Sequence, residues 1–373
     1  MSSQCGRWLE KKLEELNAAE IYSAEKTNEE IARQYGLNVG NIVKLNYNEN
    51  LYIPRARVAS MLKEVADEID MRIYPQDEET KLKEAIAAYL QVPAESVTVG
   101  NSSDEVMERT VRLFLGKGDS AVTFTPTFSV FKYCVTYQGS KHVGVPLKDD
   151  FSIDMEDMRK AFISDARLLY LCSPNNPTAS QLKPREVEAL IEEFPGIVIV
   201  DEAYAEYADY SVVPLIKKYA NLAVLRTFSK AFGLAGLRLG YAVASPSVAK
   251  ALDRTPAPYV VNVVSLSMGR KMLEGVELIR ESVASLKKER RKLITELNQI
   301  EGIQAFDSKT NFVLFNAAKP YAEVYEAALQ QGLVIKKLGK LFNYQNCLRT
   351  TVGLPEMNSR LLKTLREYMR DNV

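Results

Sequence analysis

A lysine flanked by hydroxyl groups is the feature of this chain that most clearly suggests chemistry. Lys230 lies in the segment Thr227–Tyr241 (TFSKAFGLAGLRLGY), where Thr227 and Ser229 supply hydroxyls and Arg238 supplies a guanidinium. The segment follows a short apolar run that predicts a buried strand. An amine can form an imine with an aldehyde, while hydroxyl and guanidinium groups can hold a phosphate. The pattern therefore favours an aldehyde that carries a phosphate as the bound molecule.

Three further polar segments follow runs that also predict buried strands. They are Ser173–Ala179 (SPNNPTA), Asp201–Tyr204 (DEAY) and Gly100–Glu105 (GNSSDE). Ligands of open α/β sheets bind beyond the carboxyl ends of the strands, so we expect these segments to converge with the lysine segment. The last one also opens a predicted helix. Ser102 with Glu105 fits a capping box, and the free backbone N–H groups there make an anion site.

Strands and helices are expected to alternate between about residues 57 and 260. The expected strands are 97–99, 121–124, 141–146, 168–172, 197–200 and 222–225, and the expected helices are 57–67, 81–90, 103–115, 128–137 and 184–194. Continuous apolar runs are typical of strands buried on both faces. The sequence therefore predicts an α/β fold with a largely parallel sheet covered by helices.

The two ends of the chain have different patterns. Leu9, Leu13 and Leu16 share one helical face, and Thr27–Glu30 predicts a capping box for a helix that Gly36 closes. After residue 260 a long helix precedes a smaller α+β region. Its expected strands are 311–315, 333–335 and 347–352, and its expected helices are 321–331 and 357–369. We expect an N-terminal arm (1–50), a large domain (51–262) and a small domain (263–373) that begins with the long helix.

Composition excludes several classes of function. The 373 residues are 46% hydrophobic and 26% charged, as in ordinary globular proteins. Lys+Arg and Asp+Glu both number 48, so no net field attracts the chain to nucleic acid or to an anionic membrane. The N-terminus carries charges where a signal peptide needs its apolar core, and no apolar run approaches the roughly 18 residues of a membrane span. We therefore expect neither a nucleic-acid nor a membrane partner.

Cysteine and histidine usage narrows the chemistry further. The four cysteines lie far apart without a C-x-x-C pair, which argues against a metal site or a disulfide framework and favours a reducing, cytoplasmic location. The single histidine, His142, falls within a predicted strand. A His-based metal site needs more than one ligand, so we expect no bound metal. A lysine, a carboxylate or a tyrosine is the expected proton shuttle.

The combined motifs resemble those of the fold-type I, class I and II aminotransferases, which use pyridoxal phosphate. The resemblance runs from Asn46–Asn50 (NYNEN) to Leu348–Gly353 (LRTTVG), and its core is SPNNPT, DEAY and TFSKAFGLAGLRLG. It implies that Lys230 holds the cofactor and then acts as the free base. It also implies that Asp201 pairs with the pyridine nitrogen, while Tyr204 and Asn176 bind the phenolic oxygen of the ring.

The resemblance assigns the remaining cofactor contacts as well. Phe128 would stack on the ring. The phosphate would be held by the backbone amides of Ser103 and Asp104 together with the side chains of Thr227, Ser229 and Arg238. Tyr74 resembles the tyrosine that reaches this phosphate from a second subunit. The resemblance therefore implies a homodimer as the active unit.

Within the superfamily, the chain is most similar to histidinol-phosphate aminotransferases. These enzymes of histidine biosynthesis exchange an amino group between histidinol phosphate and 2-oxoglutarate. The substrate-binding residues implied are Arg349, Tyr52, Asn50 and Lys336. Lys336 stands where the family has a second anion-binding arginine, and a lysine lacks the bidentate fork of a guanidinium. Leu51, Ile53 and Ala179 also depart from the family motifs.

Alternatives remain open at this level. The donor can be an aromatic or another amino acid, and the same scaffold is used by a decarboxylase of threonine phosphate. A regulator that binds the cofactor without catalysis is a further, non-enzymatic alternative. The intact lysine and aspartate favour an enzyme.

Overall fold

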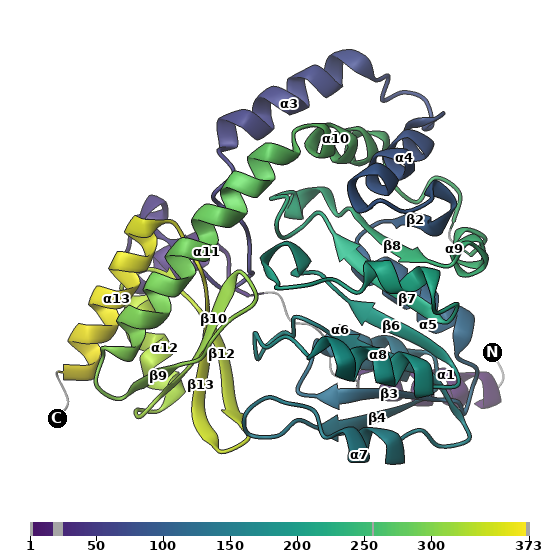
Figure 1. Ribbon diagram of the computed structural model, residues 1–373. Coiled ribbons are helices and arrows are strands. Elements are labelled where there is room, and N and C mark those ends of the chain that lie inside the picture. The colour runs from purple at the N-terminus through teal and green to yellow at the C-terminus, as the bar shows by residue number, and fades with distance from the viewer. Residues whose placement is uncertain (1–2, 18–24, 256, 371–373) are drawn as a thin grey trace.

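Two β-sheets and the long helix between them organise the chain (Figure 1). The computed structural model describes residues 3–17, 25–255 and 257–370. The larger sheet has seven strands in the order β2-β8-β7-β6-β5-β3-β4, and the smaller has four in the order β12-β13-β10-β9. The long helix α11 (Val276–Asn298) runs from the helices beside the larger sheet to the smaller sheet.

The larger sheet is mostly parallel. Its strands are β2 (Val97–Gly100), β3 (Ser120–Thr125), β4 (Lys141–Pro146), β5 (Ala166–Cys172), β6 (Ile197–Asp201), β7 (Leu222–Thr227) and β8 (Gly240–Ala244). Only β8 runs antiparallel to its neighbours, β2 and β7. The central strands are buried along their whole length, with apolar and β-branched side chains on both faces. The predicted fold class is confirmed.

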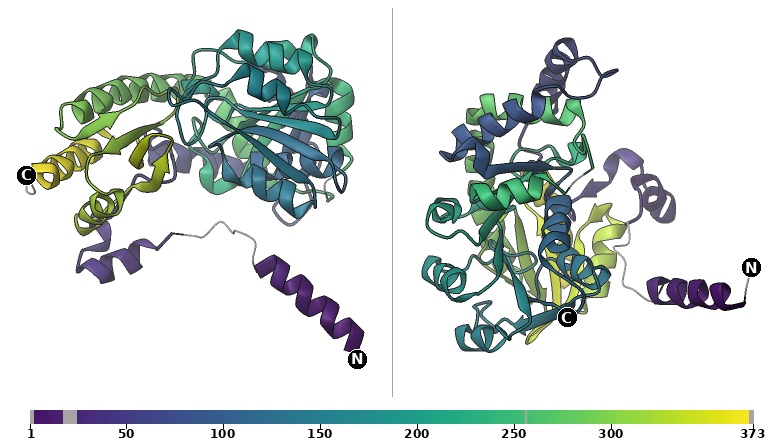
Figure 2. Two further views of the ribbon diagram at one scale, coloured as in Figure 1. Left: turned by 90° about the horizontal axis from the view of Figure 1, so that it is seen from below. Right: turned by 90° about the vertical axis from the view of Figure 1, so that its right-hand side faces the viewer.

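Helices lie on both sides of this sheet (Figures 1 and 2). The helices around the sheet are α3 (Arg55–Glu68), which packs on α10, together with α4 (Glu78–Leu90), α5 (Ser103–Phe114), α6 (Ser129–Tyr137), α7 (Met155–Lys160), α8 (Pro184–Glu193), α9 (Pro246–Asp253) and α10 (Val263–Glu274). Short 3₁₀ helices occur at η1 (Val39–Asn41), η2 (Ala94–Ser96), η3 (Ala205–Tyr207), η4 (Val213–Lys217) and η5 (Ala235–Leu237). This covering buries the apolar faces of the strands, as the sequence pattern requires.

The smaller sheet is antiparallel. It contains β9 (Ile303–Ala305), β10 (Phe312–Ala317), β12 (Lys336–Leu341) and β13 (Tyr344–Thr351), with α12 (Tyr321–Gln330) and α13 (Pro355–Arg370) beside it. A separate two-stranded pair joins β1 (Val43–Lys44) to β11 (Leu333–Val334) in parallel. Residues far apart in the sequence are therefore held next to the smaller sheet.

The predicted elements are confirmed with shifts of a few residues at their ends, and the sequence did not predict β1, β8, β9, β12, α7, α9 and α10. Strand β8 begins inside the segment that was interpreted as a loop after Lys230. Strand β12 contains lysines and a glycine, which obscure the alternation of apolar and polar residues that is typical of a strand. The long helix is preceded by a separate helix, α10, which packs against α3 and α4. The division into an arm, a large domain and a small domain stays a prediction.

The N-terminal region contains two helices. The first, α1 (Ser3–Asn17), stands clear of the rest of the chain, and Leu9 and Leu13 are exposed on it (Figure 2). The side chain of Leu16 lies outside the described residues. The second, α2 (Asn28–Tyr35), has the predicted reciprocal capping box between Thr27 and Glu30. Gly36 ends it in the left-handed conformation, as predicted.

In the part of the chain that the structure describes, none of the helices combines the length and apolar character needed to cross a membrane.

Candidate active site

A pocket lies at the carboxyl ends of the central strands and receives side chains from both sheets. Its lining consists of Asn46, Tyr47, Asn48, Ser102, Ser103, Asp104, Phe128, Cys172, Asn176, Asp201, Ala203, Tyr204, Thr227, Ser229, Lys230, Arg238, Lys336 and Arg349. All four polar segments singled out in the sequence therefore meet here. This is the edge of an open α/β sheet where ligands bind.

The amine of Lys230 lies within this pocket. Its Nζ donates a hydrogen bond of 3.0 Å to the backbone oxygen of Tyr47 and lies 5.9 Å from the centre of the Tyr204 ring. Burial lowers the pKa of Lys230 to about 8, and the positive charge of Arg349 lowers it further in the same direction. An amine with this pKa is partly neutral near physiological pH, which a nucleophile or a general base requires.

The carboxylate of Asp201 ends strand β6 and is buried. Tyr170 donates a hydrogen bond of 2.7 Å to its Oδ2, and the backbone N–H of Ala203 donates one of 3.0 Å to its Oδ1. Burial raises the pKa of Asp201 to about 6, although both hydrogen bonds act against this rise. A buried carboxylate held in one orientation is suited to a cationic partner.

A buried ion network fixes the ends of the two strands that carry these groups. Arg226, on β7, contacts Glu202, next to Asp201 in the chain, at 2.9 Å and Glu206 at 2.9 Å. The guanidinium also donates to Ser211 Oγ at 2.9 Å. The ends of β6 and β7 are thus tied together next to Asp201.

Replacing Arg226 by methionine should destabilise the fold by about 3–5 kcal/mol, because Glu202 and Glu206 stay buried without their cation. Urea unfolding monitored by circular dichroism measures the change. Arg159→Met is the matched control, because its ion pair with Glu193 is solvent-exposed and should contribute at most about 1 kcal/mol. Equal losses in the two variants would contradict a stabilising role for the buried network.

The part of the pocket at the start of α5 is suited to an anion. Ser102, Ser103 and Asp104 line it at the start of α5, where backbone N–H groups are free of intrahelical partners. Thr227, Ser229 and Arg238 line it as well. In this structure the guanidinium of Arg238 forms an ion pair of 2.9 Å with Asp104.

The predicted capping box at this helix is only half formed. The backbone N–H of Glu105 donates to Ser102 Oγ at 3.4 Å, as predicted. The return bond is absent, because the Glu105 carboxylate instead accepts from the N–H of Asn101 at 3.2 Å and pairs with Arg109. A buried arginine one turn along the helix attracts the carboxylate away from the position that the sequence pattern predicts.

Two cations from the smaller sheet border the pocket. Arg349 on β13 and Lys336 on β12 are directly paired across the two antiparallel strands. Arg349 donates to the amide oxygen of Asn176 and, at 2.8 Å, to the backbone oxygen of Asn46. Like charges directly opposite each other are unfavourable in a sheet unless an anion lies between or beside them.

A carboxylate of the chain itself contacts one of these two cations, Lys336. Glu25 Oε1 accepts a hydrogen bond of 2.7 Å from Lys336 Nζ, and the Glu25 carboxylate also accepts one from the side chain of Asn46. Both donors line the pocket. The position beside Lys336 is therefore one that binds a carboxylate.

The remaining predicted ring contacts also line the pocket. Phe128 follows β3 and Tyr204 follows β6, and the Tyr204 hydroxyl accepts a hydrogen bond of 3.0 Å from Asn48 Nδ2. The amide oxygens of Asn46 and Asn48 are buried and accept no hydrogen bond from the described residues. Buried acceptors of this kind are suited to donors from a bound molecule.

Three predicted site residues do not line this pocket. The Asn50 side chain is buried and bonds Ala231 O and Ser282 Oγ, so it holds the N-terminal segment against α11. Tyr52 donates its hydroxyl to Gly353 O at 2.9 Å. Tyr74 is 69% exposed and stacks on Tyr259 with ring centres 4.6 Å apart. Within one chain, none of the three reaches the lysine.

Sequence reasoning assigned no role to several residues of the site. Asn46, Tyr47 and Asn48 belong to a motif that was used for the family resemblance, and their polar side chains after Leu45 were the available signal. No local pattern indicated Glu25, because its partners Lys336 and Asn46 lie elsewhere in the sequence. Ala179, a departure from the family turn, has φ +62°. That left-handed conformation is one that glycine adopts without strain.

The fold and the site define an α/β protein with a half-buried lysine and a buried aspartate at the carboxyl ends of a mostly parallel sheet. A family model for aminotransferase class I and II matches residues 40–365. The chain belongs to this family.

Particular relatives extend the comparison. A histidinol-phosphate aminotransferase of Thermoanaerobacter pseudethanolicus is 35% identical over 327 residues, which cover 87% of this chain and 93% of that protein. Another, of Roseiflexus castenholzii, is 36% identical over 361 residues, covering 95% and 96%. The crystal structure of the Sinorhizobium meliloti histidinol-phosphate aminotransferase in complex with pyridoxal-5'-phosphate superposes with a TM-score of 0.84 at 26% identity, covering 94% and 96%.

Proposed function

We propose that this chain is a pyridoxal-phosphate-dependent aminotransferase that exchanges an amino group between histidinol phosphate and 2-oxoglutarate. The observation that carries the proposal is a single pocket in which charged groups from both sheets meet. It contains the Lys230 amine and the Asp201 carboxylate from the larger sheet, and the Arg349 and Lys336 cations from the smaller one. The first two suit the cofactor, and the last two suit anionic groups of the substrates.

The pocket residues fit pyridoxal phosphate. The start of α5 with Thr227, Ser229 and Arg238 would hold the phosphate, and Phe128, Asn176 and Tyr204 would contact the ring. When bound, this cofactor supplies an aldehyde and an electron-accepting ring that stabilises negative charge on the substrate's α-carbon. The buried Asp201 would keep a proton on the ring nitrogen, because an ionised carboxylate in a dry site favours a cationic partner.

In the reaction, residues of the chain would hold and move protons. Lys230 Nζ would hold the cofactor and, once released, would move a proton to and from the substrate's α-carbon. Tyr170 and the backbone of Ala203 keep Asp201 in one orientation through their hydrogen bonds. The Asn176 amide would contact both the ring and Arg349, since its oxygen already accepts a hydrogen bond from that guanidinium.

The cation pair supports the proposed substrates. Histidinol phosphate has a phosphate and no carboxylate, whereas 2-oxoglutarate has two carboxylates. One site must therefore accept a phosphate in one half-reaction and a carboxylate in the other. A guanidinium binds either anion with paired N–H groups, and a lysine beside it adds a point charge that suits both. The contact of Lys336 with the Glu25 carboxylate supports anion binding at this position.

A panel of amino donors with 2-oxoglutarate as acceptor tests the proposal. Histidinol phosphate should give the highest kcat/KM, with keto acid consumption matched by glutamate formation. A preference for aromatic amino acids would show that the donor is an aromatic amino acid and not histidinol phosphate. Release of carbon dioxide from threonine phosphate would change the reaction class. A purified protein that stays colourless with added cofactor would contradict the whole proposal.

Lys336→Ala should raise KM for histidinol phosphate by roughly 10-fold, as expected for one lost charge-assisted contact, and should change KM for unphosphorylated aromatic donors much less. Initial rates with both donors measure this difference. Lys337→Ala is the matched control, because successive side chains of a strand point to opposite faces. Equal loss for both donors in Lys336→Ala would remove the reason for assigning a phosphorylated substrate.

Further features of the enzyme belong to the same proposal. We infer a homodimer in which Tyr74 reaches the phosphate of the neighbouring subunit, and the exposure of Tyr74 and Tyr259 supports a partner surface there. Sedimentation velocity tests the oligomeric state. A cytoplasmic location, and the division into an arm (1–50), a large domain (51–262) and a small domain (263–373), are part of the proposal too.

A further inference from the structure

Arg109 is a deeply buried cation that the proposed reaction does not use. It lies in the middle of α5 and is 1% exposed. Burying a charge costs several kcal/mol unless its hydrogen bonds are satisfied by fixed partners. The position of those partners indicates what the residue does.

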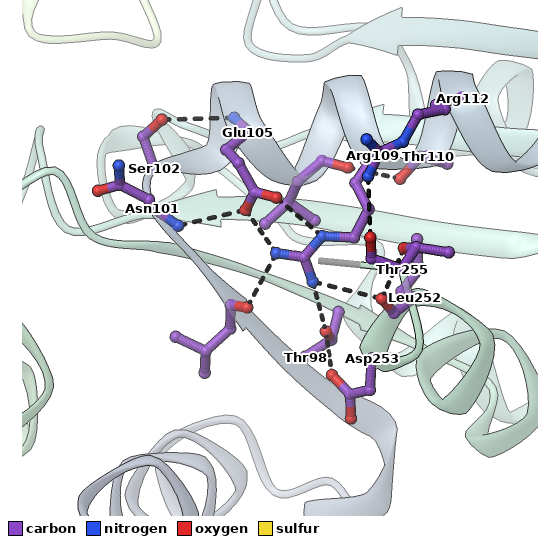
Figure 3. Close-up of polar contacts among 12 residues, drawn as sticks. Thr98, Asn101, Ser102, Glu105, Arg109, Thr110, Arg112, Leu252, Asp253 and Thr255 are labelled. Atoms are coloured by element: carbon purple, nitrogen blue, oxygen red, sulfur yellow. Dashed lines mark hydrogen bonds and ion pairs between the residues drawn. The ribbon is translucent and has the colours of Figure 1, made fainter. Parts of the chain in front are cut away.

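The guanidinium joins the end of β2 to the first turn of α5 (Figure 3). Arg109 donates to Thr98 Oγ1 at 3.3 Å and to the backbone oxygens of Val99 at 3.2 Å and Leu252 at 3.5 Å. Its Nε donates to Glu105 Oε1 at 3.0 Å, and its Nη2 contacts the second carboxylate oxygen of Glu105. A bidentate pair of this kind fixes direction as well as distance.

Glu105 in turn fixes the loop before α5, which leads into the pocket. Its Oε2 accepts a hydrogen bond of 3.2 Å from the backbone N–H of Asn101, and its own N–H donates to Ser102 Oγ at 3.4 Å (Figure 3). Ser102 has φ +83°, an uncommon conformation that neighbouring contacts must hold. The next two residues, Ser103 and Asp104, line the pocket at its anion end.

The loop is also confined on both sides by glycines. A Cβ on Gly100 would lie 2.3 Å from Glu105 Oε2 and 2.8 Å from Arg109 Nη2, and a Cβ on Gly240 would lie 2.1 Å from the backbone nitrogen of Ser103. Side chains cannot occupy either space. A movement of the Arg109–Glu105 pair would therefore be transmitted to the backbone N–H groups of the anion site.

The pair has an electrostatic consequence too. Glu105 is a negative charge in the first turn of α5, close to the position proposed for a phosphate. Arg109 compensates this charge and keeps the carboxylate directed at the loop, not at the pocket. The positive end of the helix then remains available to an external anion.

We propose that Arg109 is a positioning residue for the cofactor phosphate, acting through Glu105 and Asn101 on the backbone N–H groups that open α5. This inference rests on the proposed function, since it requires pyridoxal phosphate in the pocket. It concerns only the phosphate end of the cofactor. Binding of the same ring without its phosphate should not depend on Arg109.

Cofactor titrations of the full chain, followed by the visible absorption band, test this selectivity. In Arg109→Met the Kd for pyridoxal phosphate should rise by roughly 10- to 100-fold, as expected for a misplaced charge-assisted hydrogen bond. The Kd for pyridoxal, which lacks the phosphate, should stay within about twofold of the wild-type value. Arg112→Met is the control, because Arg112 lies on the exposed side of the same helix and donates to Thr255 O.

A second variant covers the case in which Arg109→Met does not fold. The double variant Glu105→Ala/Arg109→Met leaves neither charge buried alone, and it still removes the acceptor of the Asn101 N–H. It should show the same selective loss as Arg109→Met, because the two residues act as one unit.

The outcomes separate the two proposals. Wild-type protein that takes up neither pyridoxal phosphate nor pyridoxal contradicts the proposed function. The Arg109 inference alone fails if the wild type binds both and either folded variant keeps wild-type affinity for pyridoxal phosphate. It also fails if the affinities for the two ligands fall equally, since that result indicates a general structural role.

Discussion

Replacing Lys230 by alanine should lower kcat/KM for transamination by roughly 10⁴-fold or more, the upper range for removing a positioned general base. The amine lies in the same pocket as Asp201, and the other cations there, Arg238, Lys336 and Arg349, are placed for anions. Steady-state rates and the loss of the visible absorption band measure the effect. Lys217→Ala, an exposed lysine on η4, is the matched control and should behave like the wild type.

The pH dependence adds an independent check on the same residue. Burial lowers the pKa of Lys230 to about 8 in the cofactor-free protein. Only the neutral amine reacts with an aldehyde, so the rate of cofactor uptake should rise with pH and level off above about 8. Stopped-flow absorbance follows this rate. A plateau that begins only near the ordinary lysine value of 10.5 would contradict a desolvated amine.

Asp201→Asn should lower kcat/KM by roughly 10²- to 10³-fold, because an amide cannot stabilise a proton on the ring nitrogen as a carboxylate does. The amide can still accept from the Ala203 N–H and contact the Tyr170 hydroxyl, so the geometry is largely kept. Cofactor affinity should change less than kcat. Asp209→Asn is the control, since Asp209 is exposed and forms an ion pair with Lys309. Wild-type kcat in Asp201→Asn would contradict the proposed role.

The stability of Asp201→Asn relative to the wild type should depend on pH in a defined direction. The pKa of Asp201 is about 6 in the fold, against an ordinary value of 3.8, so the folded state binds its proton more tightly. The wild type therefore gains stability as the pH falls through 6 toward 4, and the ionised form is penalised above 6. In the cofactor-free protein the asparagine variant should be more stable by up to about 3 kcal/mol near pH 7. Urea unfolding near pH 5 and pH 7 measures this difference, which should shrink at the lower pH.

Much of the site was predictable because its residues follow strands directly. Asp201 and Lys230 come just after apolar runs, and the rule that parallel strands end at a common edge placed them together. The order of α/β elements was predictable for the same reason, since strands buried on both faces have continuous apolar sequences. Strand β8 was missed because it begins inside the lysine motif and runs antiparallel to its neighbours.

The sequence by itself determined the chemistry: an amine, a carboxylate and a phosphate-binding helix start, each encoded by a few adjacent residues. Only the tertiary structure decided which groups, distant in the sequence, contact one another. It paired Lys336 with Arg349 across two strands, brought Glu25 to Lys336 and directed Glu105 to Arg109 in place of its helix cap. The physical reason is that burial and charge pairing depend on what lies nearby in space, and no local pattern contains that information.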